Sequence, residues 1–163
     1  MKKVFLLSLL AISMWTCSKS IETPTPNTAS AAPEISLTDS NGKALNLSSL
    51  KGKVVILQFW ASWCPGCRKE NPVLVKLYDK YKDKGLEVYS VSLDTDKTQW
   101  QKAIKDDGLT WPNHVSDLLK WKSPVTTTYN VQFTPYKVLI DRKGNIQVNN
   151  FTSDMEAEVL KLL

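Results

Sequence analysis

The stretch FWASWCPGCRKENP, residues 59–72, places two cysteines two residues apart, between an apolar run and a helical pattern. The run that leads into it, KVVILQF, is rich in Val and Ile and is typical of a strand buried on both faces. After it, four apolar residues from Leu74 to Tyr81 recur at helical spacing. Cys64 is therefore expected at the start of a helix, with Cys67 one turn further along.

The start of a helix favours a negative charge, because its first N–H groups lack partners and the helix dipole is positive there. A thiol at this position has a lowered pKa, and the thiolate is the nucleophile in disulfide exchange. Cys67 lies close enough to Cys64 to close a small disulfide ring. The spacing predicts a two-step exchange: Cys64 attacks a partner disulfide, and Cys67 then attacks Cys64 and releases the reduced partner.

Two other uses of the cysteine pair fit the sequence less well. A structural metal site usually needs four ligands, whereas the chain offers one histidine, His114, and no second Cys-x-x-Cys pair. A structural disulfide that closes so short a loop would remove little chain entropy. We therefore assign no metal ligand and no cofactor, and we expect His114 at the surface.

The N-terminal region has the pattern of an export signal. Residues 1–16 join a basic start to the apolar run VFLLSLLAISMW, which is too short to span a bilayer well. Cys17 follows in an imperfect lipobox, and we expect it to be the lipidated first residue of the mature chain, the alternative being a cysteine that merely lies in an ordinary signal. Residues 17–32, rich in Ser, Thr, Pro and Ala, are predicted to be a flexible tether to a folded domain at 33–163. The protein is thus expected to be extracytoplasmic and anchored to a membrane.

The bulk composition fits one globular domain. Of the 163 residues, 42% are hydrophobic and 23% are charged. The net charge of +5 is too small to indicate nucleic-acid binding, because two of the lysines belong to the signal and most others alternate with acids. We expect a monomer that binds no nucleic acid.

The pattern of strands and helices predicts an α/β fold. The expected elements are a hairpin at 35–50 with its turn at Asn41-Gly42, a strand at 53–59, a helix ending at Gly85, a strand at 86–94, a helix at 97–108, a short helix near 116–121, two strands within 136–148, and a final helix with Ser153 as N-cap. The central strand–helix–strand unit implies a right-handed crossover and a parallel strand pair. The last two strands add antiparallel pairing, which gives a mixed sheet with helices on both faces.

Two motifs resemble those of the thioredoxin superfamily. VVILQFWASWCPGCRKENP is similar to its active-site segment, including Trp63 before the first cysteine and Pro72 in the helix, and FTPYKVLIDRKGNI is similar to its Thr-Pro before a strand. The resemblance implies a thioredoxin-like three-layer α/β/α fold with a central mixed sheet, an N-terminal β-hairpin and an inserted segment. It also implies a cis Pro135 that packs against the cysteines and a Thr134 backbone that pairs with an extended partner segment. The residues implied for the substrate groove are Trp63, Pro65, Gly66, Thr134 and Pro135.

Without this resemblance, Pro135 would be expected to be an ordinary trans proline at a strand start. The closer resemblance is to membrane-anchored, extracytoplasmic thiol-disulfide oxidoreductases of the TlpA/ResA type, on the opening hairpin, on GLTWPNHVSD and on YNVQFTPYKVLIDRKGNI. It covers residue 33 to the C-terminus and implies protein thiols and disulfides as substrates and a membrane electron donor. Asn130 and Tyr136 depart from the usual Gly and Thr, which puts the shape of the groove in question.

Glu70 is the third candidate catalytic residue. In the resembling group a glutamate three residues after the second cysteine is linked to proton handling, and a carboxylate one turn from Cys67 could take its proton. A solvated first-turn glutamate, favoured by the helix dipole, fits the sequence equally well. Thioredoxin itself has a buried Asp where this chain has Gln58, which makes Glu70 the better candidate.

Two alternatives to an oxidoreductase remain at this point. A peroxiredoxin-like peroxidase needs Pro-x-x-x-Thr/Ser-x-x-Cys, but Leu57 and Ala61 occupy those places. A copper-handling protein of the same fold needs a histidine near the cysteine pair, and His114 does not match the expected late loop. For an oxidoreductase, the absence of a histidine between the cysteines leaves the reduced form without extra stabilisation, so we expect a reductant.

Overall fold

A computed structural model describes residues 30–151 and 154–163 of the chain. The predicted signal at 1–16, the lipidation site Cys17 and the predicted N-cap Ser153 lie outside these residues. Within the described part, no helix combines the length and the apolar character needed to cross a bilayer.

The last three residues of the predicted tether belong to the folded part. Ile146 N donates a hydrogen bond to Ser30 O at 2.8 Å, and Ala32 N donates to Gly144 O at 2.9 Å. These bonds place residues 30–32 beside the final hairpin.

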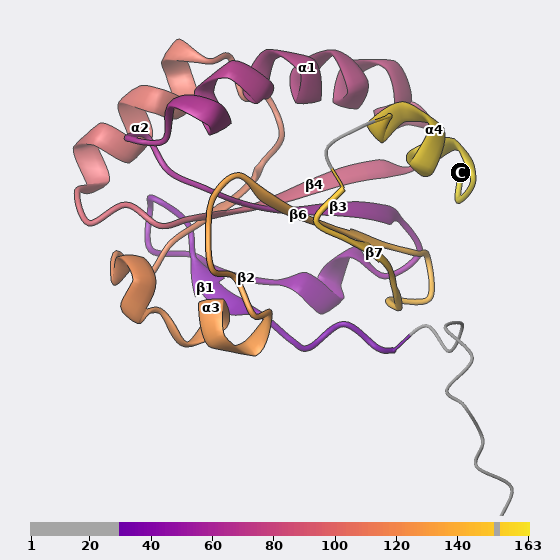
Figure 1. Ribbon diagram of the computed structural model, residues 1–163, viewed down its shortest axis with the longest axis horizontal. Helices are drawn as coiled ribbons and strands as arrows, with labels where there is room; N and C mark the ends of the chain where they lie inside the picture. Colours follow the sequence, from indigo (N-terminus) through magenta and orange to yellow (C-terminus); the bar gives the residue numbers. More distant parts are fainter. Residues whose placement is uncertain (1–29, 152–153) are drawn as a thin grey trace, which may run out of the picture.

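A five-stranded mixed sheet forms the middle layer of the molecule, in the strand order β5-β4-β3-β6-β7 (Figure 1). The strands are β3 Val54–Trp60, β4 Leu86–Ser92, β5 Asn113–Val115, β6 Tyr136–Ile140 and β7 Ile146–Asn149. β3 runs parallel to β4 and antiparallel to β6, β4 runs parallel to β5, and β6 runs antiparallel to β7. The predicted parallel crossover and final antiparallel hairpin are both confirmed.

Helices cover both faces of the sheet, which gives the predicted three layers (Figure 1). On one face lie α1 Pro65–Tyr81, α2 Lys97–Asp106 and α4 Met155–Leu160, with the short η2 Lys82–Lys84 after α1. On the other lie α3 Pro124–Thr128, η1 Leu47–Leu50 and the two-stranded hairpin of β1 Ser36–Thr38 and β2 Ala44–Asn46; η3 Lys120–Lys122 precedes α3.

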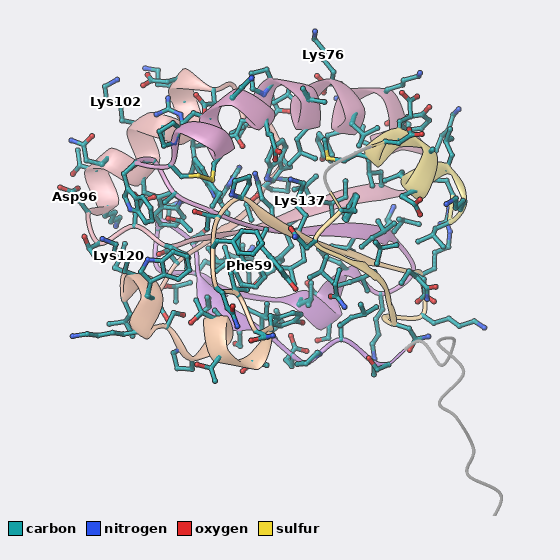
Figure 2. All side chains as sticks on the ribbon, in the orientation of Figure 1. Phe59, Lys76, Asp96, Lys102, Lys120 and Lys137 are labelled. Atoms are coloured by element: carbon teal, nitrogen blue, oxygen red, sulfur yellow. A yellow bond between two sulfur atoms is a disulfide. The ribbon has the colours of Figure 1, made fainter. Side chains whose placement is uncertain are left out.

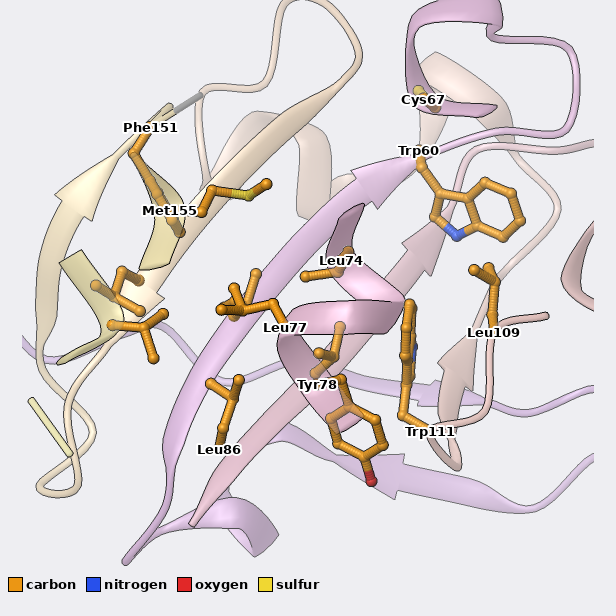
Figure 3. Packing of buried hydrophobic residues seen from close by; sticks show 14 of the residues in the cluster. Trp60, Cys67, Leu74, Leu77, Tyr78, Leu86, Leu109, Trp111, Phe151 and Met155 are labelled. Atoms are coloured by element: carbon orange, nitrogen blue, oxygen red, sulfur yellow. The ribbon is translucent and has the colours of Figure 1, made fainter. Parts of the chain in front are cut away.

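The uninterrupted apolar run of β3 follows from this layering, since all seven of its residues are buried. Its side chains alternate: Val54, Ile56 and Trp60 belong to the core under α1, where Gln58 also contacts Asn71, and Val55, Leu57 and Phe59 belong to the core under α3. Figure 3 shows Cys67 at the end of the first core where Trp60 lies, so the cysteine pair is built on a packed hydrophobic cluster.

The N-terminal hairpin turns where the sequence predicts. Gly42 has a φ of 84°, a left-handed conformation that glycine adopts without strain, and its N–H donates to Asp39 O at 3.1 Å. The Asp39 carboxylate also accepts the N–H groups of Asn41 and Lys43, at 2.7 and 2.9 Å. The turn signal of Asn41-Gly42 is therefore confirmed.

The segment between α2 and α3 is where the sequence prediction is wrong. In place of a helix over 116–121 there is only the short η3, which begins at Lys120, because the backbone is left-handed at Leu118 (φ 59°) and at Lys120 (φ 57°) and a right-handed helix cannot run through such residues. The residues just before this range form β5, a three-residue edge strand whose pairing with β4 comes from tertiary structure rather than from a long β pattern.

The final helix also begins differently. Asp154 is the N-cap of α4, and its Oδ1 accepts the N–H of Ala157 at 3.2 Å. Glu156, in the first turn of α4, accepts hydrogen bonds from Lys80 Nζ at 2.7 Å and from the hydroxyl of Tyr81. These contacts hold α4 against α1.

Candidate active site

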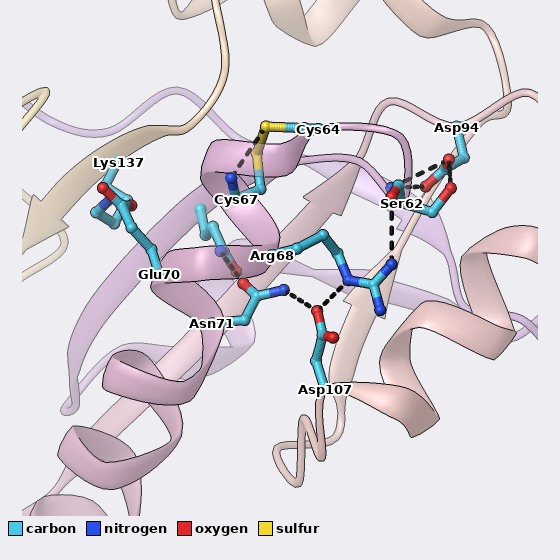
Figure 4. The surroundings of a disulfide bond; sticks show 10 residues. Ser62, Cys64, Cys67, Arg68, Glu70, Asn71, Asp94, Asp107 and Lys137 are labelled. Atoms are coloured by element: carbon cyan, nitrogen blue, oxygen red, sulfur yellow. Dashed lines mark hydrogen bonds and ion pairs between the residues drawn. A yellow bond between two sulfur atoms is a disulfide. The ribbon is translucent and has the colours of Figure 1, made fainter.

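Cys64 and Cys67 form a disulfide at the N-terminus of α1 (Figure 4). Cys64 is the N-cap residue, Pro65 follows at the first helical position, and the Cα atoms of the cysteines are 5.3 Å apart. The N–H of Cys67 points at Cys64 Sγ, 3.1 Å away. In the reduced pair, this N–H and the helix dipole are expected to favour a thiolate at Cys64, and that role stays a prediction.

The two cysteine residues differ slightly in exposure. Cys64 is 4% exposed and Cys67 is 0% exposed, which favours Cys64 as the residue that a partner reaches from solvent. Cys67 faces the core cluster under α1 and can reach Cys64 without leaving the helix. The geometry therefore suits one attacking and one resolving cysteine.

The Thr134–Pro135 peptide is cis, and Pro135 lies against the loop that carries the cysteines. A Cβ atom placed on Gly66 would come within 3.2 Å of Pro135 Cδ, so glycine allows this close approach. β6 begins to pair with β3 only at Tyr136. Among the described residues, neither Phe133 nor Thr134 makes a backbone hydrogen bond, which leaves their N–H and C=O groups open to an added strand.

The residues expected to line the groove are brought together around the disulfide. Trp63 is 45% exposed beside Cys64, Pro65 and Gly66 are exposed in the first turn of α1, and Thr134 and Pro135 are half-buried, with Pro135 next to Gly66. Their placement agrees with the resemblance; their contact with a substrate stays a prediction.

Glu70 is neither free nor simply solvated. Lys137 Nζ, which comes from β6, donates to Glu70 Oε2 at 2.5 Å (Figure 4). The residue Lys137 is 1% exposed, whereas the Glu70 side chain is 29% exposed. Glu70 is thus the counter-ion of a buried ammonium group, one helical turn from Cys67, and the pair adds no net charge beside the cysteines. A lone lysine within the apolar strand YKVLI is the sequence signal that could have revealed Lys137.

A chain of buried polar side chains joins α1 to the sheet. Trp111 Nε1 donates to Ser90 Oγ, and Ser90 Oγ donates to Gln58 Oε1, both at 2.9 Å. Gln58 Nε2 donates to Asn71 Oδ1 at 2.9 Å, and Asn71 Nδ2 donates to Asp107 Oδ2 at 2.6 Å. Gln58 thus provides a neutral amide linkage at the position where thioredoxin has a carboxylate, and this linkage fixes the depth of α1 over the sheet.

The turn that precedes Cys64 is held from two sides at Ser62 (Figure 4). Asp94, which is 1% exposed, accepts hydrogen bonds from Ser62 N at 3.0 Å and from Ser62 Oγ at 2.6 Å. Arg68 Nη1 donates to Ser62 O at 3.3 Å, and Arg68 Nε pairs with Asp107 at 2.5 Å. These contacts fix the backbone that presents Cys64.

His114, expected at the surface, is 8% exposed and stacks on Trp111 with ring centroids 5.3 Å apart. Burial lowers the pKa of His114 to about 4. Within residues 30–151 and 154–163, no three His, Cys, Asp or Glu side chains are grouped so that they could hold a metal ion. Of the other tryptophans in the described residues, Trp60 and Trp100 are core residues, and Trp121, 40% exposed, forms part of the surface beside Trp63.

Known proteins share this arrangement over most of the chain. The model of the Redoxin family matches residues 27–161. The thiol-disulfide oxidoreductase ResA of Bacillus cereus is 36% identical over 115 residues, which are 71% of this chain but only 64% of that protein. ResA of Geobacillus kaustophilus is 34% identical over 149 residues, 90% of this chain and 83% of that protein. The structure of a thiol-disulfide oxidoreductase from Bacteroides fragilis has a TM-score of 0.76 at 30% identity, covering 82% of this chain and 99% of that one.

Proposed function

Because this chain belongs to the Redoxin family and is TlpA/ResA-like within it, we propose that it is an exported thiol-disulfide oxidoreductase that acts on partner proteins. The observation that carries the proposal is the Cys64–Cys67 disulfide at the N-terminus of α1, with the Cys67 N–H directed at Cys64 Sγ. Cys64 is the attacking cysteine and Cys67 the resolving one.

The first step opens the partner disulfide and forms a mixed disulfide between the partner and Cys64. The Cys64 thiolate attacks one partner sulfur, a bond forms between that sulfur and Cys64 Sγ, and the partner's other sulfur leaves as a thiolate. The extended backbone at Thr134 pairs with the partner segment and holds its sulfur in line with Cys64. The difference in exposure between the two cysteines supports this order of attack.

The second step releases the partner. Cys67 loses its proton and attacks Cys64 Sγ, the Cys64–Cys67 bond forms, and the partner's second sulfur leaves as a thiolate that takes up a proton. Two electrons have then moved from this protein to the partner. We assign Glu70 as the acceptor of the Cys67 proton; its ion pair with Lys137, one helical turn from Cys67, supports this assignment.

We propose that the protein acts as a reductant, which needs a dithiol donor at the membrane to restore the two thiols. Two features support this direction. No histidine stands between the cysteines, and the buried Lys137 is matched by Glu70, so no unmatched positive charge stabilises the thiolate form. The predicted leader at 1–16 and Cys17 support an extracytoplasmic location with a lipid anchor. We also propose that the protein is a monomer and that it binds no nucleic acid.

Trapping tests the proposed function. In the full-length protein, Cys67→Ala should leave partners joined to Cys64 as mixed disulfides that resist dissociation until a reductant is added. Cys64→Ser, the matched control, should trap few or none. The assignment of the attacking cysteine is wrong if both variants capture the same partners in equal yield, and the function is wrong if neither variant forms a mixed disulfide.

A further inference from the structure

Three exposed aromatic side chains stand around the disulfide, and together we call them the aromatic rim. They are Trp63, 45% exposed, Trp121, 40% exposed, and Phe133, 52% exposed. Large aromatic side chains are among the residues most enriched in binding surfaces, because they bury much area at a small cost in conformational entropy. Their gathering at one site therefore indicates a surface that a partner covers.

The rim lies at the two segments that flank the reactive sulfur. Trp63 adjoins Cys64 and meets Trp121 edge to face, with ring centroids 6.4 Å apart. Phe133 directly precedes the Thr134–Pro135 peptide, and Pro135 lies close to Gly66 in the first turn of α1. A segment that pairs with the open backbone of Thr134 therefore runs next to Phe133.

A shallow hollow of about 440 Å³ continues the path from Trp121 toward Phe133. It is lined by Trp121, Thr126, Thr127, Asn130, Val131 and Gln132. Because the chain runs directly from the hollow to Phe133 and Thr134, the hollow can seat a side chain of a segment bound there.

The Trp121 side of the rim carries two lysines, whereas another hollow that Trp63 lines holds both acidic and basic side chains, namely Asp94, Asp96, Asp106, Arg68 and Lys102. Lys120 Nζ lies 4.9 Å from the centroid of the Trp63 ring, and Lys122 is exposed two residues further along η3. In the part of the chain that the structure describes, neither lysine is paired with a carboxylate. The nearby carboxylate of Asp117 is already hydrogen-bonded within its own segment: it accepts hydrogen bonds from Leu119 N at 3.0 Å and from Ser123 Oγ at 2.5 Å.

The segment that carries these lysines is held in one conformation. Ser116 Oγ accepts the N–H of Leu118 at 3.0 Å, and Asp117 bridges to Ser123. The left-handed residues Leu118 and Lys120 turn the chain so that Lys120 and Trp121 reach Trp63. A site that is ordered before binding loses less entropy when the partner arrives.

From these observations we propose that the rim and its two lysines select substrate segments that carry an acidic residue beside the reactive cysteine. The occupant is an extended segment of a disulfide-bearing protein, whose carboxylate pairs with Lys120 and Lys122 while an apolar side chain covers Trp121. This inference rests on the proposed function and adds the chemical class of its substrate.

Peptide exchange kinetics test it. Two short peptides, each oxidised as a mixed disulfide with 2-mercaptoethanol, differ only in Glu or Lys on both sides of the cysteine. Each is mixed with the reduced full-length protein, and each rate is divided by the rate of the same peptide with dithiothreitol, which removes intrinsic differences in peptide reactivity. The protein should favour the Glu peptide about tenfold at low salt, and the preference should shrink as salt rises.

Charge reversal makes the test specific to the site. A double variant, Lys120→Glu with Lys122→Glu, should lose or invert the preference. Lys76→Glu is the matched control, because Lys76 is an exposed lysine that projects from α1 away from the sheet, whereas Lys120 lies beyond the opposite side of the sheet (Figure 2). This control should keep the preference of the unaltered protein.

The possible outcomes distinguish a failure of this inference from a failure of the proposed oxidoreductase function. Bis(2-hydroxyethyl) disulfide is small and neutral, so all folded variants should reduce it at the same rate if the exchange chemistry is intact. Equal normalised rates for the two peptides, or a preference that survives the double reversal, would overturn the inference and leave the function standing. So would sedimentation showing that a second copy of the chain covers the rim. Failure to reduce the neutral disulfide would overturn the function itself.

Discussion

The two faces of the central sheet come from the same strands but are built differently. The face under α3 and the hairpin is apolar apart from two tyrosine hydroxyls; its buried members include Val55, Leu57, Phe59, Tyr89, Val91, Tyr129, Val138 and Ile140. The face under α1 buries five polar or ionisable side chains from the strands: Gln58, Ser90, Ser92, His114 and Lys137. We call them the apolar face and the mixed face.

This difference between the two faces of the sheet reflects their different roles. Buried polar groups cost stability unless every one is paired, so a sheet built only for stability would have two apolar faces. Here the polar groups lie under α1, the helix that carries both cysteines, and two of them, Gln58 and Lys137, fix its position through Asn71 and Glu70. Both faces bury a hydrophobic cluster, and the mixed face adds the polar contacts that position the site.

The largest expected effect is on the apolar face. Phe59 is fully buried and packs against Tyr129, with ring centroids 5.6 Å apart. Phe59→Ala should lower the free energy of unfolding by about 4 kcal/mol, through lost burial and the cavity left behind. Urea denaturation measures this change. A loss below about 1 kcal/mol would show that this face does not carry the stability assigned to it.

On the mixed face, the two partners of one ion pair should behave unequally. Glu70→Gln leaves the ammonium of Lys137 buried without a counter-ion and should cost about 3 kcal/mol. Lys137→Met leaves a carboxylate that is already 29% exposed and can be hydrated, so it should cost within about 1 kcal/mol. The same urea titrations compare the two variants; equal losses would contradict the account of Lys137 as a buried charge held by Glu70.

A smaller effect should depend on pH. Burial lowers the pKa of His114 from 6.5 to about 4, so below pH 6.5 the unfolded chain binds a proton that the folded chain does not. Stability should therefore fall as the pH drops from about 6.5 to about 4, by about 2–3 kcal/mol from this residue. His114→Phe should remove this contribution to the pH dependence of the free energy of unfolding. Urea titrations of the two proteins at several pH values from about 4 to 6.5 measure the difference. Parallel curves would contradict the burial of a neutral imidazole.

The same contrast explains what the sequence could predict. The apolar run of β3, the helical spacing from Leu74 to Tyr81 and the Cys-x-x-Cys pair are local patterns, and each predicts its element or its chemistry directly. Pro135 needed the resemblance to a family, because nothing in the residues around it distinguishes a cis from a trans peptide.

What the sequence did not reveal depends on contacts between distant residues. Lys137 looks like a surface lysine until β6 places it beside Glu70, 67 residues earlier in the chain. His114 is buried because β5 pairs with β4, and that strand is too short to leave a period-2 pattern. Leu118 and Lys120 are residue types that seldom adopt a left-handed backbone, so the turn that positions Trp121 carries no sequence signal.

The central claim is that the mixed face and the start of α1 make Cys64, and not Cys67, the reactive thiol. The most direct measurement is the rate of iodoacetamide alkylation of each cysteine in the reduced full-length protein as a function of pH, read by peptide mass spectrometry. Cys64 should react first, with a rate that reaches half of its maximum below the pH of about 8.5 typical of a free cysteine, and Cys67 should stay protected until the protein unfolds. Faster labelling of Cys67, or a Cys64 rate that follows the pH profile of an ordinary thiol, would contradict the account.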